Sequence, residues 1–272
     1  MQPLKPIHIL ALLLALLATA CSDIEEADRL IYVKPEPVGR KVLIEDFTGQ
    51  RCVNCPTATL EIEKLQQFYG ADTIIAVGIH SGPFAKTLRG VPYSLYTAVG
   101  DEYYNHWKVE SQPMGVIDRT GTCDYNLWGS VVREEVAKNA PLSIEAKCIY
   151  DEATREVFVY CYGRGVDGHV VGKLQIWLIE DGIIDFQFMP DGSRDNEYVH
   201  NHVLRCAVNG TWGTDITVEE GDSWSEKYSY KLNEEWKPEN MSVVAFVYDD
   251  RGVCQVTKCP VIPITEGTTG NE

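Results

Sequence analysis

Hydrophobic and polar positions follow two different patterns along the chain, and the change falls near residue 140. Before that point, short apolar runs alternate with segments in which apolar residues recur every three or four positions. Such runs are typical of buried strands, and such spacing is typical of amphipathic helices. After it, apolar and polar residues alternate and turn signals are frequent, which favours antiparallel strands. The pattern therefore predicts an α/β part followed by an all-β part.

The first part is predicted to contain strands and helices in alternation. This order implies a small sheet with helices on its faces. We therefore expect residues 41–139 to form one domain. Its predicted strands cover residues 42–44, 74–79 and 112–118, and its predicted helices follow residue 55 and cover residues 94–107 and 127–139.

The second part, residues 140–265, begins with a predicted β-hairpin. Residues 142–148 alternate apolar with polar side chains and are predicted to form the first strand. A turn follows, and residues 157–162 are predicted to form the second strand of the hairpin. Many short strands separated by turns predict an antiparallel β-sandwich of the immunoglobulin-like kind. We expect residues 266–272 to form a flexible tail. The other predicted strands cover residues 173–180, 201–207, 223–232, 242–248 and 253–257.

The N-terminus has the features of an export signal. Lys5 supplies a positive charge, and residues 7–20 are almost entirely apolar. This run is shorter than the roughly 20 residues that a membrane-spanning helix needs, so residues 1–20 are predicted to be a signal peptide. Small residues directly before Cys21 resemble a bacterial lipobox. The resemblance implies that Cys21 is lipidated and becomes the new N-terminus.

Residues 21–40 are predicted to be a tether behind the lipidated cysteine. Their first part is acidic, and Pro35 and Pro37 favour extended backbone over helix. Residues 22–26 also resemble an acidic signal that sends some Bacteroidetes lipoproteins to the cell surface.

Composition narrows the range of partners. The 272 residues carry a formal net charge of -16. This acidity argues against a nucleic-acid partner and against charge-driven binding to an acidic membrane surface. We therefore predict that the protein contacts a membrane through the lipid at Cys21 and binds no nucleic acid.

Cysteine usage fits an exported protein. The chain has nine cysteines, and lipidation of Cys21 would leave an even number that can pair in an oxidising compartment. Cys148 and Cys161 flank the first predicted hairpin at positions that could lie opposite each other. Outside the C-x-x-C motif described next, six cysteines allow fifteen pairings, and the sequence leaves the choice open. The other four of these six are Cys123, Cys206, Cys254 and Cys259.

The sequence KVLIEDFTGQRCVNCP, residues 41–56, carries the candidate chemistry. An apolar run ends near Asp46, a turn follows, and Cys52-Val-Asn-Cys55 precedes a helical pattern. A cysteine at a helix N-terminus meets free N–H groups and the positive end of the helix dipole, which favour its thiolate. We expect Cys52 to be partly exposed there.

This arrangement resembles the thioredoxin fold over residues 41–139. Cys52 and Cys55 match the redox pair of that fold. Asp46 matches its buried acid, which serves the second cysteine in proton transfer, and Pro113 matches its cis-proline facing the cysteines. Val53-Asn54 and Arg51 depart from the usual residues inside and before the pair. His80 and His106 are interpreted as ordinary loop and helix-end residues.

The resemblance implies thiol–disulfide exchange with a protein partner at the Cys52 face. Cys52 would attack a partner disulfide, Cys55 would resolve the mixed disulfide, and Asp46 would transfer the proton. The alternative is that Cys52 and Cys55 form a permanent structural disulfide in a surface binding or accessory lipoprotein. The sequence supports both functions, so enzymatic activity stays open.

Two polar stretches carry side chains of the types that bind metal ions. His200-Asn-His202 places two imidazoles on one strand face, and residues 191–197 carry oxygen side chains at alternate positions. The first lacks further ligands, and the second lacks the glycine and distal glutamate of a calcium loop. We predict no metal and no cofactor.

Several separate segments resemble the Bacteroidetes lipoproteins of the outer-membrane-protein-twenty-eight family. The resemblance implies a lipid-anchored protein of the cell outer membrane, on its periplasmic or surface face. It implies no settled biochemical activity. The segments are FTGQRCVNCP at 47–56, VHNHVLR at 199–205, NGTW at 209–212 and VVAFVYD at 243–249.

Overall fold

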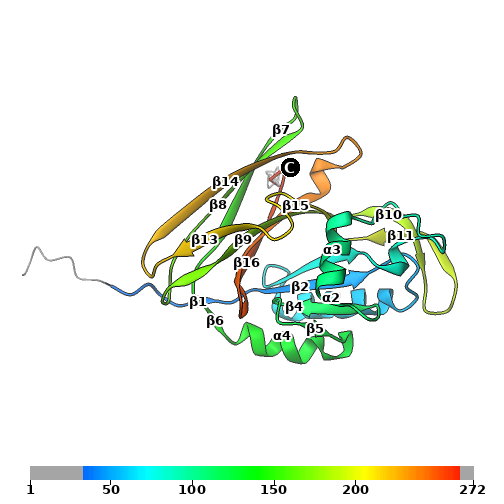
Figure 1. Ribbon diagram of the computed structural model, residues 1–272, viewed down its shortest axis with the longest axis horizontal. Coiled ribbons are helices and arrows are strands. Elements are labelled where there is room, and N and C mark those ends of the chain that lie inside the picture. Colours follow the sequence, from blue (N-terminus) through cyan, green and yellow to red (C-terminus); the bar gives the residue numbers. More distant parts are fainter. Residues whose placement is uncertain (1–32, 264–272) are drawn as a thin grey trace, which may run out of the picture. The chain divides into compact units, whose positions relative to one another are not determined.

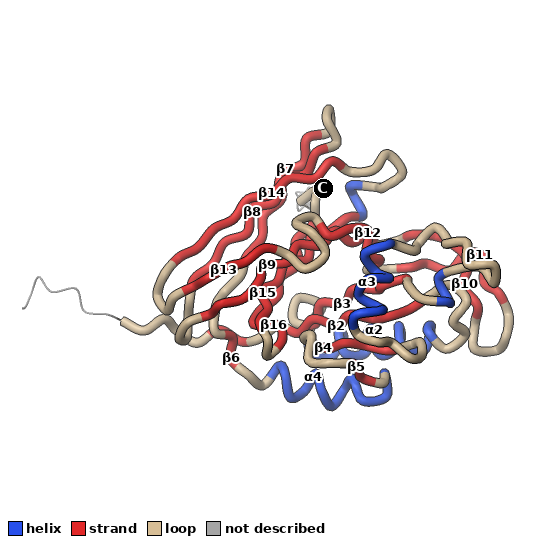
Figure 2. The backbone as a smooth tube through the Cα atoms, in the orientation of Figure 1, coloured by secondary structure: helices blue, strands red, loops and turns tan. Residues whose placement is uncertain are grey.

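Strands are the predominant secondary structure in this computed structural model, which describes residues 33–263 (Figures 1 and 2). Three α-helices and a few short 3-10 turns accompany several sheets in this range. The predicted signal peptide, the predicted lipidation site Cys21 and the predicted tail all lie outside the described residues, as does most of the tether.

A nine-stranded sheet is the largest element. Its strands run in the order β16-β15-β9-β12-β3-β2-β4-β5, and β13 pairs with the first half of β9. The pairs β2–β3 and β12–β3 are parallel, and the other pairs are antiparallel. The strands are β2 (Val42–Thr48), β3 (Ile74–His80), β4 (Met114–Ile117), β5 (Thr122–Cys123), β9 (Val170–Glu180), β12 (Val203–Ala207), β13 (Thr214–Val218), β15 (Met241–Asp249) and β16 (Gly252–Pro260).

This sheet contains strands from both sides of residue 140. Val203 of β12 lies opposite Gly78 of β3, and the Gly78 N–H donates to the His202 carbonyl at 2.8 Å. The other edge of β12 pairs with β9. The change in hydrophobic pattern near residue 140 is therefore a change in how strands are connected, and the hydrogen-bonded sheet continues across it.

Helices cover both faces of β2 and β3. α2 (Cys55–Tyr69) and α4 (Trp128–Val136) pack on the face that carries Val42 and Ile44, and α3 (Ala98–His106) packs on the face that carries Leu43 and Phe47. Alternate residues of a strand point to opposite faces, so a strand buried on both sides is largely apolar. The 3-10 turns are η2 (Pro83–Ala85), η3 (Tyr125–Leu127) and η4 (Pro238–Asn240).

A three-stranded antiparallel sheet packs over one end of the large sheet. Its order is β14-β8-β7, and its inward residues share a core with β9, β15 and β16. Its strands are β7 (Glu145–Asp151), β8 (Glu156–Arg164) and β14 (Ser223–Lys231). Two further pairs of strands are β1 (Val38–Gly39) with β6 (Asn139–Ala140), and β10 (Ile183–Phe188) with β11 (Arg194–His200).

Two details differ from the sequence prediction. The helix expected over residues 94–107 begins only at Ala98, because the Thr97 side chain caps it by accepting a hydrogen bond from the Gly100 N–H. The hydrophobic pattern predicts neither strand of the β10–β11 hairpin. Most of β11 is exposed and polar, so it lacks the apolar alternation by which strands are recognised.

A buried ion pair lies on the α3 side of β2. Glu45 is fully buried, and its Oε1 accepts a hydrogen bond from Arg119 Nε at 2.9 Å. The Arg119 guanidinium also lies 4.3 Å from the ring centre of Tyr248 and 4.8 Å from that of Phe246. Burial raises the pKa of Glu45, and the neighbouring Arg119 charge opposes that rise. The Arg119 charge therefore compensates the buried charge of Glu45 on this face of the sheet.

Candidate functional site

The C-x-x-C motif occupies the turn between β2 and α2. Cys55 is the first residue of α2, Cys52 lies in the turn before it, and the two form a disulfide. The Cys52 N–H donates to the Gly49 carbonyl at 2.9 Å. Gly49 has no room for a side chain, since a Cβ there would lie 2.5 Å from the Phe84 carbonyl carbon. Pro56 is well placed in the first turn of the helix, where no intrahelical N–H donor is needed.

The expectation of a partly exposed Cys52 is wrong. Cys52 and Cys55 are each only 2% exposed. The β10–β11 hairpin is the reason: Gln187 of β10 is itself buried, and its side-chain amide donates to the Cys52 carbonyl at 2.8 Å. In Figure 1 this hairpin lies at the right, where the β2 arrow ends.

Further contacts fix the hairpin against the turn. The Phe188 N–H donates to the Gln50 carbonyl at 2.9 Å, and the Gln50 side chain donates to the Phe186 carbonyl at 3.3 Å. The Phe186 ring meets Tyr93 edge to face, with ring centres 4.9 Å apart. The hairpin therefore covers the disulfide through backbone, side-chain and aromatic contacts together.

Asp46 is buried beneath α2. It lies on the same face of β2 as Val42 and Ile44, and it is only 3% exposed. Its neighbours across the sheet are Gly78 and Gly115. Burial raises the pKa of the Asp46 carboxyl from 3.8 to about 7. Its Oδ1 has no hydrogen-bond partner among the described residues.

A small cavity of about 50 Å³ connects Asp46 to the disulfide. This volume is enough for water molecules. Gln187 and Tyr198 of the hairpin are part of its wall. The other polar or sulfur-bearing side chains on its wall include Cys55, Thr59, Glu63, His80 and His200.

The sequence analysis assigned no functional role to the two histidines of this cavity, His80 and His200. His80 is the last residue of β3, and its ring centre lies 5.2 Å from that of His200. Burial lowers the pKa of His80 well below its usual value, so it is neutral at pH 7. Its position at the end of a strand parallel to β2 is the one signal that could have placed it beside the cysteines.

Pro113 lies at the start of β4, beside the end of β2. The Gln112–Pro113 peptide bond is cis. The Gln112 side chain donates to the Thr48 carbonyl at 2.7 Å and to the Ser81 carbonyl at 3.2 Å. Of the site residues predicted from sequence, Asp46 and Cys55 line the cavity, Cys52 lies beside it, Pro113 is not on its wall, and Cys21 lies outside the described residues.

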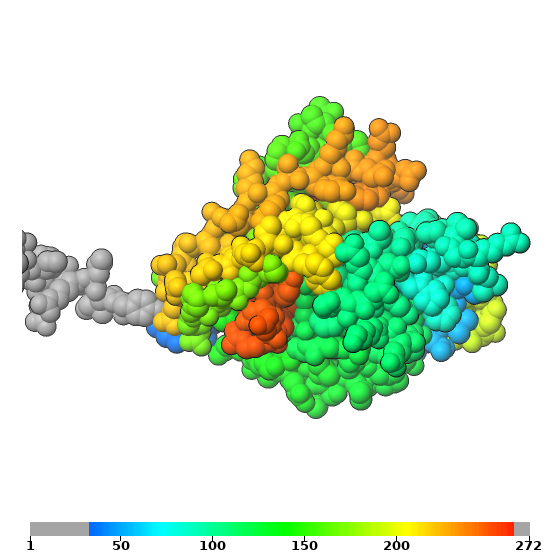
Figure 3. All heavy atoms as spheres, in the orientation of Figure 1, coloured from blue at the N-terminus to red at the C-terminus, as the bar shows by residue number. Residues whose placement is uncertain are grey.

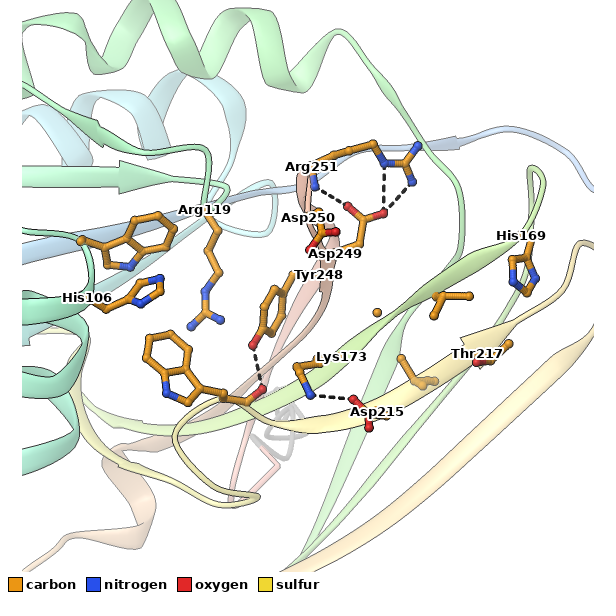
Figure 4. A pocket seen from close by; sticks show the side chains of 15 residues that line it. His106, Arg119, His169, Lys173, Asp215, Thr217, Tyr248, Asp249, Asp250 and Arg251 are labelled. Atoms are coloured by element: carbon orange, nitrogen blue, oxygen red, sulfur yellow. Dashed lines mark hydrogen bonds and ion pairs between the residues drawn. The ribbon is translucent and has the colours of Figure 1, made fainter.

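A second, open groove of about 1,040 Å³ lies between α3, β9, β13 and the β15–β16 turn. In Figure 4 the Arg119 side chain points toward Tyr248 in this groove. The cations on its wall have acidic partners: Lys173 contacts Asp215 at 2.6 Å, and Arg251 contacts Asp249 at 2.6 Å. Figure 3 shows the β15–β16 turn in red-orange on this face of the molecule.

The described residues offer little for a metal or for a membrane span. They contain no group of three or more His, Cys, Asp or Glu side chains placed to hold a metal. His202 instead pairs with Asp181 at 2.9 Å, and His200 contacts the Phe186 carbonyl. Within residues 33–263 no helix is both long and apolar enough to cross a membrane.

Comparison with protein families identifies the chain. The model described as "Outer membrane protein Omp28" matches residues 100–263, which is more than half of the sequence. The chain belongs to the Omp28 family. The family predicted from the sequence is thus confirmed, and with it the association with the outer membrane.

Solved structures show what this Omp28-family chain is similar to. HBP35 of Porphyromonas gingivalis matches with a TM-score of 0.65 and 15% identity over 88% of this chain and 82% of that chain, which is a likeness of fold. A domain of the outer membrane lipoprotein Omp28 from Porphyromonas gingivalis is 28% identical over 46% of this chain and 92% of that chain, with a TM-score of 0.34. A search of curated proteins gave no match.

Asp46 makes the stability of the fold depend on pH. Its pKa is higher in the folded state than the 3.8 of an ordinary aspartate, so the folded protein holds the proton more tightly. The resulting stability is complete below about pH 4 and is lost as the pH rises through about 7. Between about pH 4 and pH 7 the unfolding free energy of the wild type should fall as Asp46 loses its proton. For Asp46→Asn we expect this fall to be smaller than in the wild type by on the order of 4 kcal/mol, as measured by urea unfolding at several pH values.

Two comparisons define this experiment. Burial also raises the pKa of Asp118 to about 7, so Asp118 contributes equally to the pH dependence of stability in the wild type and in Asp46→Asn. Asp72→Asn, at an exposed loop carboxylate, should leave the pH profile of the wild type unchanged. If Asp46→Asn has the same slope as the wild type, Asp46 does not hold its proton in the folded state.

Proposed function

We propose that this Omp28-family protein is a lipoprotein, held in the outer membrane through Cys21, that exchanges thiols and disulfides through Cys52 and Cys55. In this proposal residues 41–139 act as a thioredoxin-like unit. The observation that carries it is Asp46: a buried carboxyl with a pKa of about 7, in the same cavity as Cys55. Burying a carboxyl without a full set of hydrogen bonds destabilises a fold, and a role in proton transfer accounts for its presence.

The proposed reaction oxidises a partner dithiol. A partner thiolate attacks the Cys52 sulfur, the Cys52–Cys55 bond breaks, and Cys55 leaves as a thiolate. Asp46, protonated beforehand, gives its proton to Cys55 through the cavity. The second partner thiol then attacks its own mixed disulfide and releases Cys52 as a thiol. The partner gains a disulfide, and the protein holds two thiols. The reverse direction uses Asp46 as the base.

The partner reaches Cys52 only when the β10–β11 hairpin moves, because Cys52 is buried beneath Gln187. The hairpin is attached by a limited set of contacts. These include hydrogen bonds to the turn at residues 49–52, the Tyr93 contact, a hydrogen bond from Ser94 to Asp185, and the ring contact of His200 with His80. We infer that opening of this hairpin precedes exchange. A reducing protein that fits beside α2 is the kind of partner this requires.

A second function rests on the same burial. If the hairpin never opens, the Cys52–Cys55 bond is a structural disulfide, and the protein is an accessory or binding lipoprotein of the envelope. The 2% exposure of Cys52 favours this alternative. The two functions differ in the reduction potential of the pair and in whether Cys52 forms a mixed disulfide.

Cys55→Ser tests exchange directly. In this variant Cys52 is a thiol that can still attack a partner disulfide, which is the reverse direction of the reaction. Without the resolving cysteine, the mixed disulfide on Cys52 should persist and be captured from the cell envelope after acid quenching and alkylation. Cys52→Ser is the matched control and should capture nothing, since Cys52 is the cysteine that forms the mixed disulfide in this proposal. A reduction potential of the wild-type pair below about -300 mV, together with no captured partner, would establish the structural alternative.

Gln187→Ala tests the hairpin. The substitution removes the hydrogen bond to the Cys52 carbonyl, which is worth about 1 kcal/mol net. We expect dithiothreitol to reduce the Cys52–Cys55 bond roughly fivefold to tenfold faster, since 1.4 kcal/mol is a factor of ten. Gln66→Ala is the control, because Gln66 also donates to a backbone carbonyl, that of Ile74, but lies away from the disulfide. Equal reduction rates in wild type and Gln187→Ala would mean that the hairpin does not limit access.

Cys21→Ser tests the anchor independently of the redox chemistry. Without a lipid-accepting cysteine, the protein should move from the membrane fraction to the soluble fraction of lysed cells. Cys123→Ser, which removes a cysteine of the described fold, should stay with the membranes. Retention of Cys21→Ser in the membrane fraction would place the anchor elsewhere and leave the exchange proposal standing.

A further inference from the structure

Three cysteines meet in the core between the two sheets. Cys148 comes from β7, Cys161 from β8 and Cys259 from β16. The Sγ atoms of Cys148 and Cys259 lie 3.2 Å apart. A disulfide has its sulfurs about 2.05 Å apart, so a displacement of about 1 Å would bring these two into bonding distance. They are 111 positions apart in sequence, so only the folded sheets bring them together.

Strand register excludes the pair that the sequence suggested. Cys148 lies opposite Val159, and Cys161 lies opposite Ala146. Cys148 and Cys161 are therefore diagonal neighbours across the hairpin. Diagonal positions have Cα atoms about 7–8 Å apart, which is beyond the roughly 4.4–6.8 Å that a disulfide spans. The idea that these two cysteines lie directly opposite each other is wrong, because the strands pair two residues out of that register.

Cys148 and Cys259 differ in exposure and in thiol pKa. Cys259 is partly exposed near the end of β16, whereas Cys148 is buried. The hydrogen bond from Cys148 lowers the pKa of Cys259, and the same contact together with burial raises the pKa of Cys148. Cys259 is therefore the sulfur that an external oxidant reaches as a thiolate. Cys161 is fully buried, and burial raises its pKa to about 12.

We propose that Cys148 and Cys259 form a second disulfide, which bonds β7 of the three-stranded sheet to β16 of the nine-stranded sheet and leaves Cys161 as a thiol. The oxidant is an external disulfide. The Cys259 thiolate attacks one of its sulfurs and releases the first thiolate. Cys148 then loses its proton, attacks the Cys259 sulfur and releases the second. Two protein thiols become one disulfide, and the oxidant becomes two thiols.

This bond would secure the edge of the large sheet. β16 is the terminal strand of that sheet and pairs only with β15 within it. A covalent link from Cys259 to Cys148 fixes its end to the second sheet and closes a loop of more than 100 residues, for which the loss of unfolded-state entropy is large. The proposal does not depend on exchange at Cys52 and Cys55, since it concerns a different pair on different strands.

Peptide mapping of the full-length wild-type protein is the direct test. The protein is isolated without reductant or oxidised with glutathione disulfide. It is then alkylated, digested and analysed by mass spectrometry. We expect a disulfide-linked peptide pair containing Cys148 and Cys259, and an alkylated Cys161. A Cys148–Cys161 or Cys161–Cys259 link, or alkylation of all three thiols after oxidation, would overturn the proposal.

Substitutions give an independent count of thiols in the oxidised, then unfolded, chain. Cys148→Ser leaves Cys259 without its partner. It should raise the count by one or, where Cys259 keeps half of the oxidant, add one mixed disulfide that mass spectrometry detects on Cys259. Cys161→Ser removes a free thiol and should lower the count by one. If no bond forms, both substitutions lower the count by one. Cys148→Ser should also lower the melting temperature of the oxidised protein by about 10 °C. It should change the melting temperature of the reduced protein far less. Equal changes in both states would overturn the proposal.

Discussion

The pairing of β12 with β3 on one side and with β9 on the other joins strands from both sides of residue 140 into one nine-stranded sheet. β12 runs parallel to β3, and Val203 at its start lies beside Gly78, two residues before the end of β3. The chain between β9 and β12 must therefore leave and re-enter the sheet at the carboxyl ends of β2 and β3. That chain is the β10–β11 hairpin, and the C-x-x-C turn follows β2 at the same edge. The burial of the disulfide is thus a consequence of strand order.

Two adjacent carboxylates on β2 show how the faces of the sheet differ. Glu45 points to the α3 side, where Arg119 neutralises it within a group of aromatic rings. Asp46 points to the α2 side, where its burial is not compensated by a cation and its pKa rises to about 7. A strand places successive residues on opposite faces, so one position separates a carboxylate paired with a cation from a buried carboxyl that has no such partner.

The family match and the candidate redox site fall largely in different parts of the chain. The Omp28 match covers residues 100–263, which include the hairpin and the three clustered cysteines. Cys52, Cys55 and Asp46 precede it. The β10–β11 hairpin, which covers the disulfide, therefore lies within the matched residues, whereas the disulfide itself lies before them. This arrangement explains how family membership can leave the activity of the pair open, and why the hairpin is the place to test it.

The sequence by itself determined the local elements and much of the candidate site. The strand before the C-x-x-C motif, the helix after it, and β3, β4 and α4 all lie close to their predicted positions, because apolar spacing reports directly which faces are buried. The resemblance to the thioredoxin fold is what pointed to Asp46. Its burial follows from lying in a strand whose two faces are both covered.

Only the tertiary structure decided which distant segments meet. The contacts of Gln187 with Cys52, of Gly78 with His202, and of Cys148 with Cys259 each join residues more than 100 positions apart. The β10–β11 hairpin escaped prediction because most of β11 is polar and exposed, and so lacks the apolar alternation of a strand. Hydrophobic periodicity records whether a residue is buried but not against what, and strand pairing is set by backbone hydrogen bonds that every residue type can make.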